Sequence, residues 1–532
     1  MIHFDNYPLK DVLPILMSGL KINKLPKPRA LKSADEKILR TRTVAEVFTP
    51  SRIVKQMIDA IDDGKIDSRW LEIACGEAPF ITNRYDAESG EIIPSDVRAG
   101  ILDRKLRIAK DFNEAKRAVQ SVYGYELQGD SLLIARANVL LTFVESVQNI
   151  SENDLAEVAE IIAWNFFKLD GTKEPQPLFG EEIIDWRTGR KFIFGGNTMK
   201  KFDFVIGNPP YQEETDNEST RKLPVYDKFM EAAYKVGEKV ELITPARFLS
   251  NAGDTPKDFN KRMLNDPHLK VLDYAPDASK YFKGVYIEGG VAITLRDETK
   301  NYGAIDTFIP FAELESIHKK VCVDNSDFRS LNEIIYPRAI YRFVKDNSFV
   351  DTNAFEKMSD YFFDARPDDG NEYIQIFGLM KSKRNYKWIR RDNVTNHESL
   401  DKYKVFVPQA NGASGKLGEE AARIISKPVV GEPLTGNTAT FTVIGAFDSR
   451  AEAESCLKYI KSKFARAMVS ILKVTQAITP EKWKYVPLQD FTPSSDIDWN
   501  KSIAEIDEQL FDKYGLDEQE RNFIRTKVRE MV

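Results

Sequence analysis

The sequence predicts an α/β fold for residues 43–300, in which a mostly parallel sheet is covered by helices on both faces. The main observation is that short apolar runs, typical of buried strands, alternate there with helical segments. The chain is also long, with 532 residues of which 42% are apolar, and it can therefore build more than one hydrophobic core. Because the pattern changes beyond about residue 310, we expect a second domain of mixed α+β structure there.

The elements of the first domain are predicted from apolar spacing and from signals for helix ends. Thr49 stands in the position of an N-cap and Pro50 in the first helical position, and apolar residues at helical spacing follow them. Residues 131–146 are predicted as a helix, residues 156–172 as a helix followed by a short strand that ends at Asp170, and residues 84–120 as an insertion that holds a loop and a charged helical stretch. The other predicted strands lie within residues 70–73, 121–130, 201–206, 269–276 and 290–297, and residues 239–250 are predicted as a strand and a turn.

Composition argues against several classes of protein. The three cysteines form no CxxC pair and the four histidines are scattered, so we expect neither a metal site nor disulfides. No apolar stretch approaches the length of about 20 residues that a membrane helix needs, and the N-terminus lacks the layout of a signal peptide. We therefore expect a cytoplasmic protein with no membrane partner. The net charge of −6 does not by itself indicate a nucleic-acid partner.

The segment "KFDFVIGNPPYQ", residues 201–212, begins as a buried strand and then stops being able to pair as one. Gly207 breaks the strand, and the two prolines after Asn208 carry no N–H group and favour an extended backbone before them. The sequence therefore predicts a stiff projection beyond the strand end, made of Asn208, Pro209, Pro210 and Tyr211. The alternative is a proline-capped strand end without chemistry.

This projection suits the methylation of an exocyclic amine on a flat ring. Two acceptors at a fixed angle, the side-chain oxygen of Asn208 and the carbonyl of Pro209, could hold both N–H groups while the nitrogen lone pair points at a methyl donor. Tyr211 would give the ring a face to stack on, and alignment would do most of the work. A base inside a DNA duplex would first have to be flipped out.

The second domain contains a basic and aromatic stretch, "KSKRNYKWIRR", at residues 381–391. It suits contact with phosphates and stacking on bases, although a solvated surface is an equally simple interpretation. The predicted DNA-binding residues of this stretch are Lys387, Trp388, Arg390 and Arg391. Residues 456–476 are predicted as one long amphipathic helix whose basic side chains are available to a partner, and the acidic tail from Asp496 as helical packing.

Five motifs occur in a defined order: FTP at 48–50, EIACGEAPF at 72–80, YGYEL at 123–127, LDG at 169–171 and GNPPY at 207–211. In this order they resemble the adenine-specific DNA N6-methyltransferases of bacterial restriction-modification systems, in the subgroup whose target-recognition region comes last. The resemblance implies a Rossmann-like S-adenosylmethionine-dependent methyltransferase domain at 43–310 and a mixed α+β target-recognition domain at 311–490. A basic N-terminal arm at 1–42 and an acidic helical brace at 491–532 complete the expected organisation.

The resemblance also implies a role for individual residues. Thr49 and Pro50 match the contact to the methionine end of S-adenosylmethionine, and Glu72, Ala74, Cys75 and Gly76 match the glycine-containing loop around it. Glu126 matches the acid on the ribose hydroxyls and Asp170 the acid near the adenine amine, with Asn165 as a competing assignment; Phe80 lines the adenine pocket or belongs to the core. The second aromatic against the flipped base is one of Tyr281, Phe282 and Tyr286.

Two features depart from the family pattern. Ala78 stands where the loop usually has a second glycine, and the insertion before Glu126 lengthens the usual spacing. Alanine adds only a methyl group, so cofactor binding is still expected.

Other functions compete with this one. The same tetrad occurs in enzymes that methylate RNA or a protein glutamine, and a catalytically silent DNA-binding specificity subunit is a further alternative. Cytosine C5 methylation needs a cysteine nucleophile, commonly after a proline, and none of the three cysteines follows one. The resemblance implies double-stranded DNA as one partner. No nuclease pattern is evident, so we expect cleavage to need a separate restriction endonuclease as another partner.

Overall fold

In the computed structural model of the protein, the chain folds into two compact units, Met1–Thr307 and Phe308–Val532. The residues that the structure describes are 32–33, 36, 49–86, 88–170, 182–194, 201–213, 223–250, 255–285, 287, 289–410, 417–418, 420–473 and 477–531. Most of the arm predicted at residues 1–42 and the candidate Tyr286 lie outside them. Over these ranges, no helix combines the length and the apolar character that a membrane span requires.

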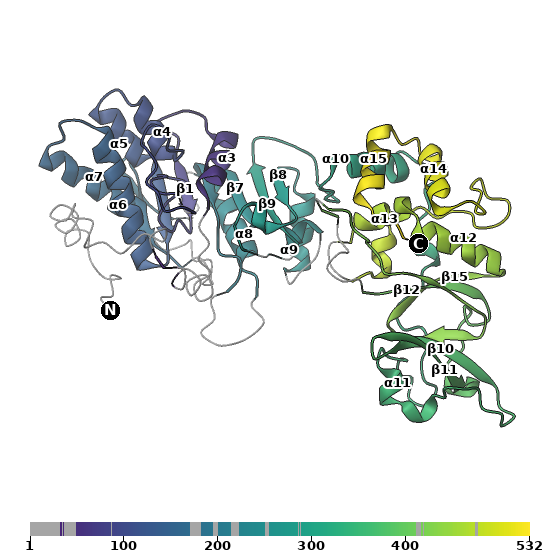
Figure 1. The fold of residues 1–532 in the computed structure, drawn as a ribbon. Helices are drawn as coiled ribbons and strands as arrows, with labels where there is room; N and C mark the ends of the chain where they lie inside the picture. Colours follow the sequence, from purple (N-terminus) through teal and green to yellow (C-terminus); the bar gives the residue numbers. More distant parts are fainter. Residues whose placement is uncertain are drawn as a thin grey trace. The chain divides into compact units, whose positions relative to one another are not determined.

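The first unit is built on a large sheet that is seven strands wide in the described residues, in the order β3-β2-β1-β6-β7-β9-β8. Figure 1 labels four of its strands, β1, β7, β8 and β9. The strands β3, β2, β1, β6 and β7 run parallel to one another, whereas β9 is antiparallel to both β7 and β8. The predicted mixed α/β fold with a mostly parallel sheet is therefore confirmed. The strands are β1 (Trp70–Ile73), β2 (Val122–Glu126), β3 (Phe166–Lys168), β6 (Phe202–Gly207), β7 (Gly237–Pro245), β8 (Leu269–Ala275) and β9 (Val291–Asp297), and a separate hairpin pairs β4 (Glu182–Asp185) with β5 (Arg190–Ile193).

Helices connect most of these strands. The chain leaves β1 toward β2 in one direction across the sheet and leaves β6 toward β7 in the other. Because such connections between parallel strands are almost always right-handed, the two sets of helices cover opposite faces. The helices are α3 (Ser51–Ile61), α4 (Ile101–Ile108), α5 (Phe112–Gln120), α6 (Gly129–Ser146), α7 (Glu152–Asn165), α8 (Tyr226–Val236) and α9 (Lys257–Asn265).

Two local predictions in this unit were wrong. Residues 84–120 are not all an insertion, because α4 and α5 are the helices of the β1-to-β2 connection. The start of α3 also differs, since Pro50 occupies the N-cap position and no side chain caps the helix. The hydroxyl of Thr49 instead accepts a hydrogen bond from the side chain of Asn208.

Close packing fixes the ends of β1 and β6 against each other. The rings of Trp70 and Phe204, which are partners in the two strands, stack with their centroids 4.3 Å apart. At the end of β6, a Cβ atom on Gly207 would lie 2.7 Å from the carbonyl oxygen of Ile73. Only glycine allows this approach, so the residues that follow Gly207 begin beside the end of β1.

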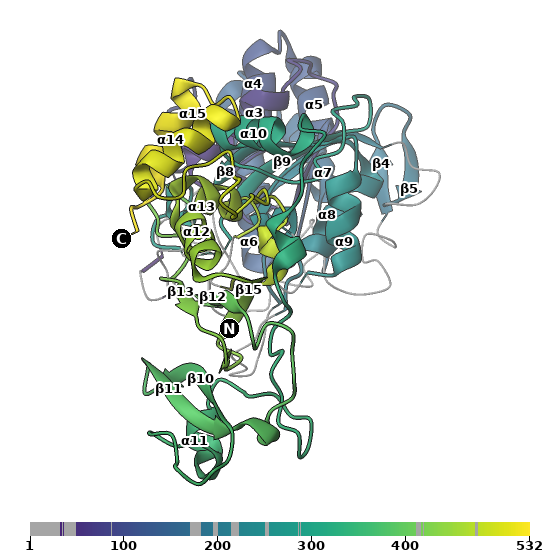
Figure 2. The ribbon, with the colours of Figure 1, turned by 90° about the vertical axis from the view of Figure 1, so that its right-hand side faces the viewer.

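The second unit contains two small sheets in the orders β11-β10-β14 and β13-β12-β15. Helices α12 to α15 gather on one side of strands β12 and β15, and strands β10 and β11 lie on the other side (Figure 2). The strands are β10 (Tyr373–Met380), β11 (Lys383–Arg390), β12 (Tyr403–Pro408), β13 (Val429–Gly431), β14 (Thr435–Asn437) and β15 (Phe441–Phe447). The helices are α10 (Ala312–His318), α11 (Ala354–Lys357), α12 (Arg450–Lys461), α13 (Lys463–Ser470), α14 (Ile503–Lys513) and α15 (Glu518–Lys527).

The long basic helix predicted at residues 456–476 is wrong. Ser462 interrupts it with ψ at 149°, and its side chain caps α13 by accepting the N–H of Ala465. Arg466 is fully buried and donates to the carbonyls of Arg423 and Arg529, while the ammonium of Lys458 donates to the carbonyl of Trp499 at 2.7 Å. These cations hold the unit together and are not available to a partner.

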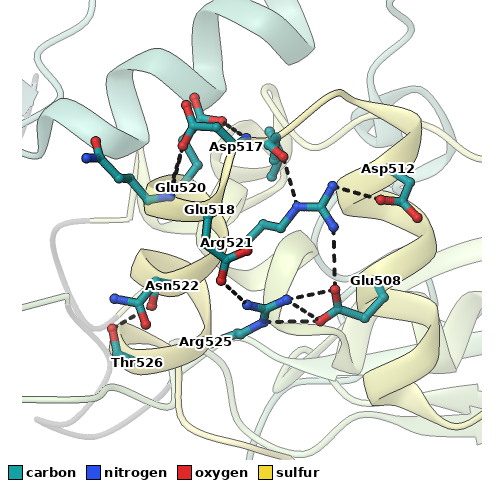
Figure 3. A network of polar contacts seen from close by, with 11 residues as sticks. Glu508, Asp512, Asp517, Glu518, Glu520, Arg521, Asn522, Arg525 and Thr526 are labelled. Carbon is teal, nitrogen blue, oxygen red and sulfur yellow. Dashed lines mark hydrogen bonds and ion pairs between the residues drawn. The ribbon is translucent and has the colours of Figure 1, made fainter.

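The acidic tail is helical and packs on the rest of the second unit. Apolar residues of α14 and α15 belong to the same core cluster as residues of α10, α12 and α13. Ion pairs join the two tail helices, since Arg525 donates to Glu508 at 2.8 Å and Arg521 donates to Asp512 at 2.7 Å (Figure 3). The capping boxes begun by Ser502 and by the residue before α15 fix the start of each helix.

Candidate functional site

The candidate site lies where the strand order of the first sheet reverses. From β1 the chain continues to β2 on one side, and β6 is the neighbour of β1 on the other side. Ligands of open α/β sheets bind outside the carboxyl ends of the strands at such a reversal. The loop after β1, residues 74–80, and the Asn208–Tyr211 segment after β6 both start at this edge, because Ile73 and Gly207 are partners in the two strands.

Buried acceptors hold the loop after β1. The carboxylate of Glu72, which is 2% exposed, accepts the N–H groups of Phe80 and Ile81 at 3.2 and 3.0 Å. Asn138 of α6, which sequence reasoning missed, donates to the carbonyl of Glu77 at 3.1 Å. The hydrogen bonds of Glu72 therefore hold the backbone at the end of this loop.

The backbone of this loop turns through left-handed conformations. Gly76 has φ at +55°, and two alanines do the same, with φ at +45° for Ala74 and +60° for Ala78. Ala78 therefore adopts the conformation that a glycine favours, at a steric cost to its own backbone. Although Ala78 stands where the family pattern has a glycine, its backbone keeps the left-handed conformation typical of glycine. Cys75 is 2% exposed, and its N–H donates to the carbonyl of Tyr125 at 2.9 Å.

Glu126, at the end of β2, reaches the same loop. Its Oε2 atom accepts the N–H of Gly76 at 2.8 Å, and Oε1 accepts the N–H groups of Leu127 and Gln128 at 2.9 and 2.8 Å. Burial raises the pKa of the Glu72 carboxyl well above its ordinary value, the two backbone donors lower it, and the charge of Glu126 raises it further. Two carboxyl groups thus brace one loop from neighbouring strands.

Asp170 and its competitor Asn165 lie at opposite ends of β3. Asn165 is fully buried before the strand, where its amide donates to the carbonyl of Val122 at 2.9 Å and accepts from the indole of Trp186 at 2.8 Å. Asp170 is half-buried beyond the carboxyl end, and the N–H of its neighbour Leu169 donates to the carbonyl of Glu126. Only Asp170 is therefore at the edge where a ligand is expected.

Thr49 and Asn208 are in contact although 159 residues separate them. The amide nitrogen Nδ2 of Asn208 donates to the hydroxyl of Thr49 at 3.3 Å. Thr49 is 2% exposed and directly precedes Pro50, the residue from which α3 starts. The two prolines differ in burial, since Pro209 is buried and Pro210 is half-buried. The start of α3 and the stiff segment therefore meet at this hydrogen bond.

Tyr211 meets one of the three candidate aromatics. Its ring lies edge-on to the ring of Phe282, with centroids 6.5 Å apart. The hydroxyl of Tyr211 is buried and has no hydrogen-bond partner among the described residues, and burial raises its pKa. Tyr281 is 1% exposed within the hydrophobic core, and Phe80 is equally buried there. Phe282 is 3% exposed and belongs to the same core cluster, and of the candidates that the structure describes it is the one whose ring lies beside Tyr211.

The cysteines are not set up as nucleophiles. Burial raises the pKa of the Cys75 thiol well above its ordinary value and that of Cys322 to about 12, and it also raises the pKa of Cys456. A nucleophilic cysteine needs the opposite shift. Within the ranges that the structure describes, no group of three His, Cys, Asp or Glu side chains could hold a metal ion.

The predicted DNA-binding residues lie in the second unit, around the edge strand β11. Lys387 pairs with Asp364, Arg390 donates to Asp392 at 2.6 Å, and Arg391 donates to the side chain of Asn396 at 2.6 Å. The two arginines line an open pocket of about 270 Å³ together with Asn371, Glu372, Asp392 and Val394.

Trp388 and Arg390 share one face of β11 with Arg384 and Tyr386, which belong to the same basic and aromatic stretch and stand at period-two spacing with them. Lys387 points to the other face, so the structure does not bring the predicted group of four together on one face.

Residues 120–282 match the family model described as Eco57I restriction-modification methylase. The matched part contains Glu126, Asp170, the Asn208–Tyr211 segment and Phe282, and it leaves out the loop after β1 and the second unit. This part of the chain is therefore similar to the methylases of restriction-modification systems.

Several solved structures are also similar to the chain. The DrdV–DNA complex shares 12% identity at a TM-score of 0.43, over 88% of this chain and 57% of that chain. The M protein of the type I restriction enzyme EcoKI shares 15% identity at a TM-score of 0.29, over 48% and 45%. The type IIL restriction-modification enzyme MmeI in complex with DNA shares 10% identity at a TM-score of 0.40, over 92% and 78%. The chain spans about half the length of the first two structures. Comparison with curated proteins gave no match.

Proposed function

We propose that the protein is a DNA methyltransferase that transfers a methyl group from S-adenosylmethionine to the N6 amine of a flipped adenine. The observation that carries the proposal is the placement of two sequence motifs at one edge of the sheet. The loop braced by Glu72 and Glu126 follows β1, and the Asn208–Tyr211 segment follows its neighbour β6. A cofactor loop and an amine-binding segment on neighbouring strand ends are what methyl transfer requires.

The residues around the loop fit the proposed cofactor chemically. The order β3-β2-β1-β6-β7 corresponds to a Rossmann-like strand order, whose reversal point binds nucleotides. The carboxylate of Glu126 accepts hydrogen bonds, which suits the two ribose hydroxyls, and Asp170 suits an adenine amine. The small residues Ala74 and Gly76 let a ligand approach the backbone. When bound, S-adenosylmethionine supplies an already activated methyl group.

The chain's own residues would hold and orient the amine. Asn208 and the carbonyl of Pro209 would accept its two N–H groups, and the proline ring would keep that carbonyl pointed outward because φ is locked. Tyr211 would stack on the base and replace part of the stacking that the base loses on leaving the duplex. No cysteine takes part, because burial keeps all three thiols protonated.

Double-stranded DNA is the proposed partner, and a separate restriction endonuclease is the proposed companion in a restriction-modification system. The second unit would contact the DNA through the face of β11 that bears Trp388 and Arg390. The family match supports this class of reaction for residues 120–282.

Label transfer tests the proposal directly. The full chain would be incubated with S-adenosylmethionine carrying a deuterated methyl group and with genomic DNA free of methylation, and the nucleosides would be analysed by mass spectrometry. We expect labelled N6-methyladenine from the wild type and none from Asn208→Ala, which should still bind DNA. Label on RNA or on a glutamine peptide instead would favour the alternative substrates. DNA binding without any transfer would favour a silent specificity subunit.

A further inference from the structure

We propose that Thr49 is a positioning residue that holds the amide of Asn208 in place. The inference rests on the proposed function and adds to it, because it gives Thr49 a task other than contact with the cofactor. It starts from the hydrogen bond in which Asn208 Nδ2 donates to Thr49 Oγ1 at 3.3 Å.

The two ends of an asparagine amide have opposite chemistry. The oxygen accepts hydrogen bonds and the nitrogen donates them, and a turn of 180° about the last side-chain bond exchanges the two with little change in shape. An amine substrate presents N–H groups, so only the orientation that offers the oxygen can hold it. In the reverse orientation, the amide N–H groups of Asn208 would face the N–H groups of the substrate amine, and two donors form no hydrogen bond. The proposed catalytic role of Asn208 therefore depends on an amide that is held with its oxygen toward the amine.

The hydroxyl of Thr49 anchors this amide: a hydroxyl can both accept and donate, and here it accepts from Nδ2. Where Thr49 Oγ1 takes the hydrogen of Nδ2, the oxygen Oδ1 is on the opposite side of the same amide, and it carries two lone pairs. Thr49 is itself held, since it is 2% exposed and the next residue is the N-cap of α3. The carbonyl of Pro50 accepts the N–H groups of Ile53 and Val54 at 2.9 and 3.0 Å, which fixes the helix start.

The threonine hydroxyl is not used for the task that the sequence predicted for it. Helix α3 begins after Pro50 and has no side-chain cap, so Thr49 does not satisfy the first N–H groups of the helix. The buried hydroxyl of Thr49 is therefore stabilised by the hydrogen bond from Asn208 and not by capping the helix. The hydrogen bond joins Thr49 to Asn208, which is 159 positions later in the chain. Through such a contact the fold can hold the side chain of Asn208 in its stiff loop.

The experiment separates orientation of Asn208 from contact with the cofactor. Thr49→Val removes the hydroxyl at nearly constant shape, Thr49→Ser keeps it, and Ser51→Ala removes a hydroxyl two residues away as the matched control. Single-turnover transfer to DNA and the Kd of S-adenosylmethionine would be measured for each, because the single-turnover rate isolates the chemical step. Thermal unfolding would verify that each variant folds. If Thr49→Val does not fold, Thr49→Ala would be used in its place.

We expect the single-turnover rate of Thr49→Val to fall by about 3- to 10-fold, the value of one hydrogen bond, while the cofactor Kd changes by less than about 2-fold. Thr49→Ser and Ser51→Ala should keep the wild-type rate. An unchanged rate in Thr49→Val, or a loss of rate matched by an equal loss of cofactor affinity, would overturn the inference. Lack of transfer by the wild type would instead contradict the proposed function itself.

Discussion

Glu126 accepts the backbone N–H of Gly76 at 2.8 Å, so the end of β2 holds the loop that follows β1. The same carboxylate accepts two further N–H groups from its own loop, at 2.9 and 2.8 Å. A carboxylate held by three backbone donors is oriented before any ligand arrives, and pre-orientation of this kind strengthens binding. One side chain therefore shapes the loop and, in our proposal, contacts the ribose.

The first prediction concerns this carboxylate. Glu126→Gln replaces one acceptor oxygen by a donor group, which cannot accept from Gly76 and from a ribose hydroxyl. We expect the Kd of S-adenosylmethionine, measured by calorimetry, to rise by about 10- to 100-fold, the value of a hydrogen bond to a charged group. Glu157→Gln, which removes an exposed partner of Lys116, is the control and should bind as the wild type does. Equal affinities in the two variants would contradict the assigned role.

The aromatic face of Tyr211 gives the second prediction. Its ring packs against Phe282, whereas its hydroxyl has no hydrogen-bond partner in the described parts of the chain. Tyr211→Phe should therefore keep transfer activity, and Tyr211→Ala should weaken binding of the flipped base by about 1–3 kcal/mol, the range for base–aromatic stacking. Fluorescence of 2-aminopurine at the target position reports the flipped base. If the phenylalanine variant loses as much as the alanine variant, stacking is not the role of Tyr211.

The sequence predicted the strands of the large sheet, because buried strands have a recognisable local pattern of apolar residues; it did not predict the hairpin of β4 and β5. Phe202, Phe204 and Ile206 alternate with the period of a strand, and glycine and proline mark the strand end. The motif residues Glu72 and Glu126 could likewise be found, since they lie within such strands.

Other features depend on contacts between distant parts of the chain and have no local signal. Asn138 lies inside an apolar helix, and nothing in its neighbourhood indicates that it donates to the carbonyl of Glu77. The break at Ser462 is another example, because the helical spacing of apolar residues continues through it and tertiary packing decides where α12 ends. The partners that bury Arg466 come from segments 43 and 63 residues away.

The third prediction concerns the salt dependence of DNA binding. The side chains of Arg390 and Arg391 line the pocket beside β11, and the pairs that they form leave them near the surface. Replacing both by glutamine should reduce the slope of log Kobs against log salt by about 0.9 for each arginine that contacts a phosphate. Lys387→Gln is the control, because Lys387 lies on the other face of β11 and pairs with Asp364. A titration series with one duplex at several salt concentrations measures the slopes; identical slopes would assign the arginines to a solvated surface.

The last prediction concerns a buried carboxyl group outside the proposed site. Glu241 of β7 is 0% exposed, neither of its oxygens has a hydrogen-bond partner in the described residues, and burial raises its pKa from 4.5 to about 9. Between these two values the folded protein keeps a proton that the unfolded chain has lost, so stability falls as pH rises through this window. The loss approaches about 1.4 kcal/mol for each pH unit. Glu241→Gln has no proton to lose, so its thermal midpoint should fall less than that of the wild type between about pH 6 and about pH 8.5. The exposed variant Glu157→Gln should follow the wild type, and parallel curves for all three proteins would show that Glu241 does not titrate in this range.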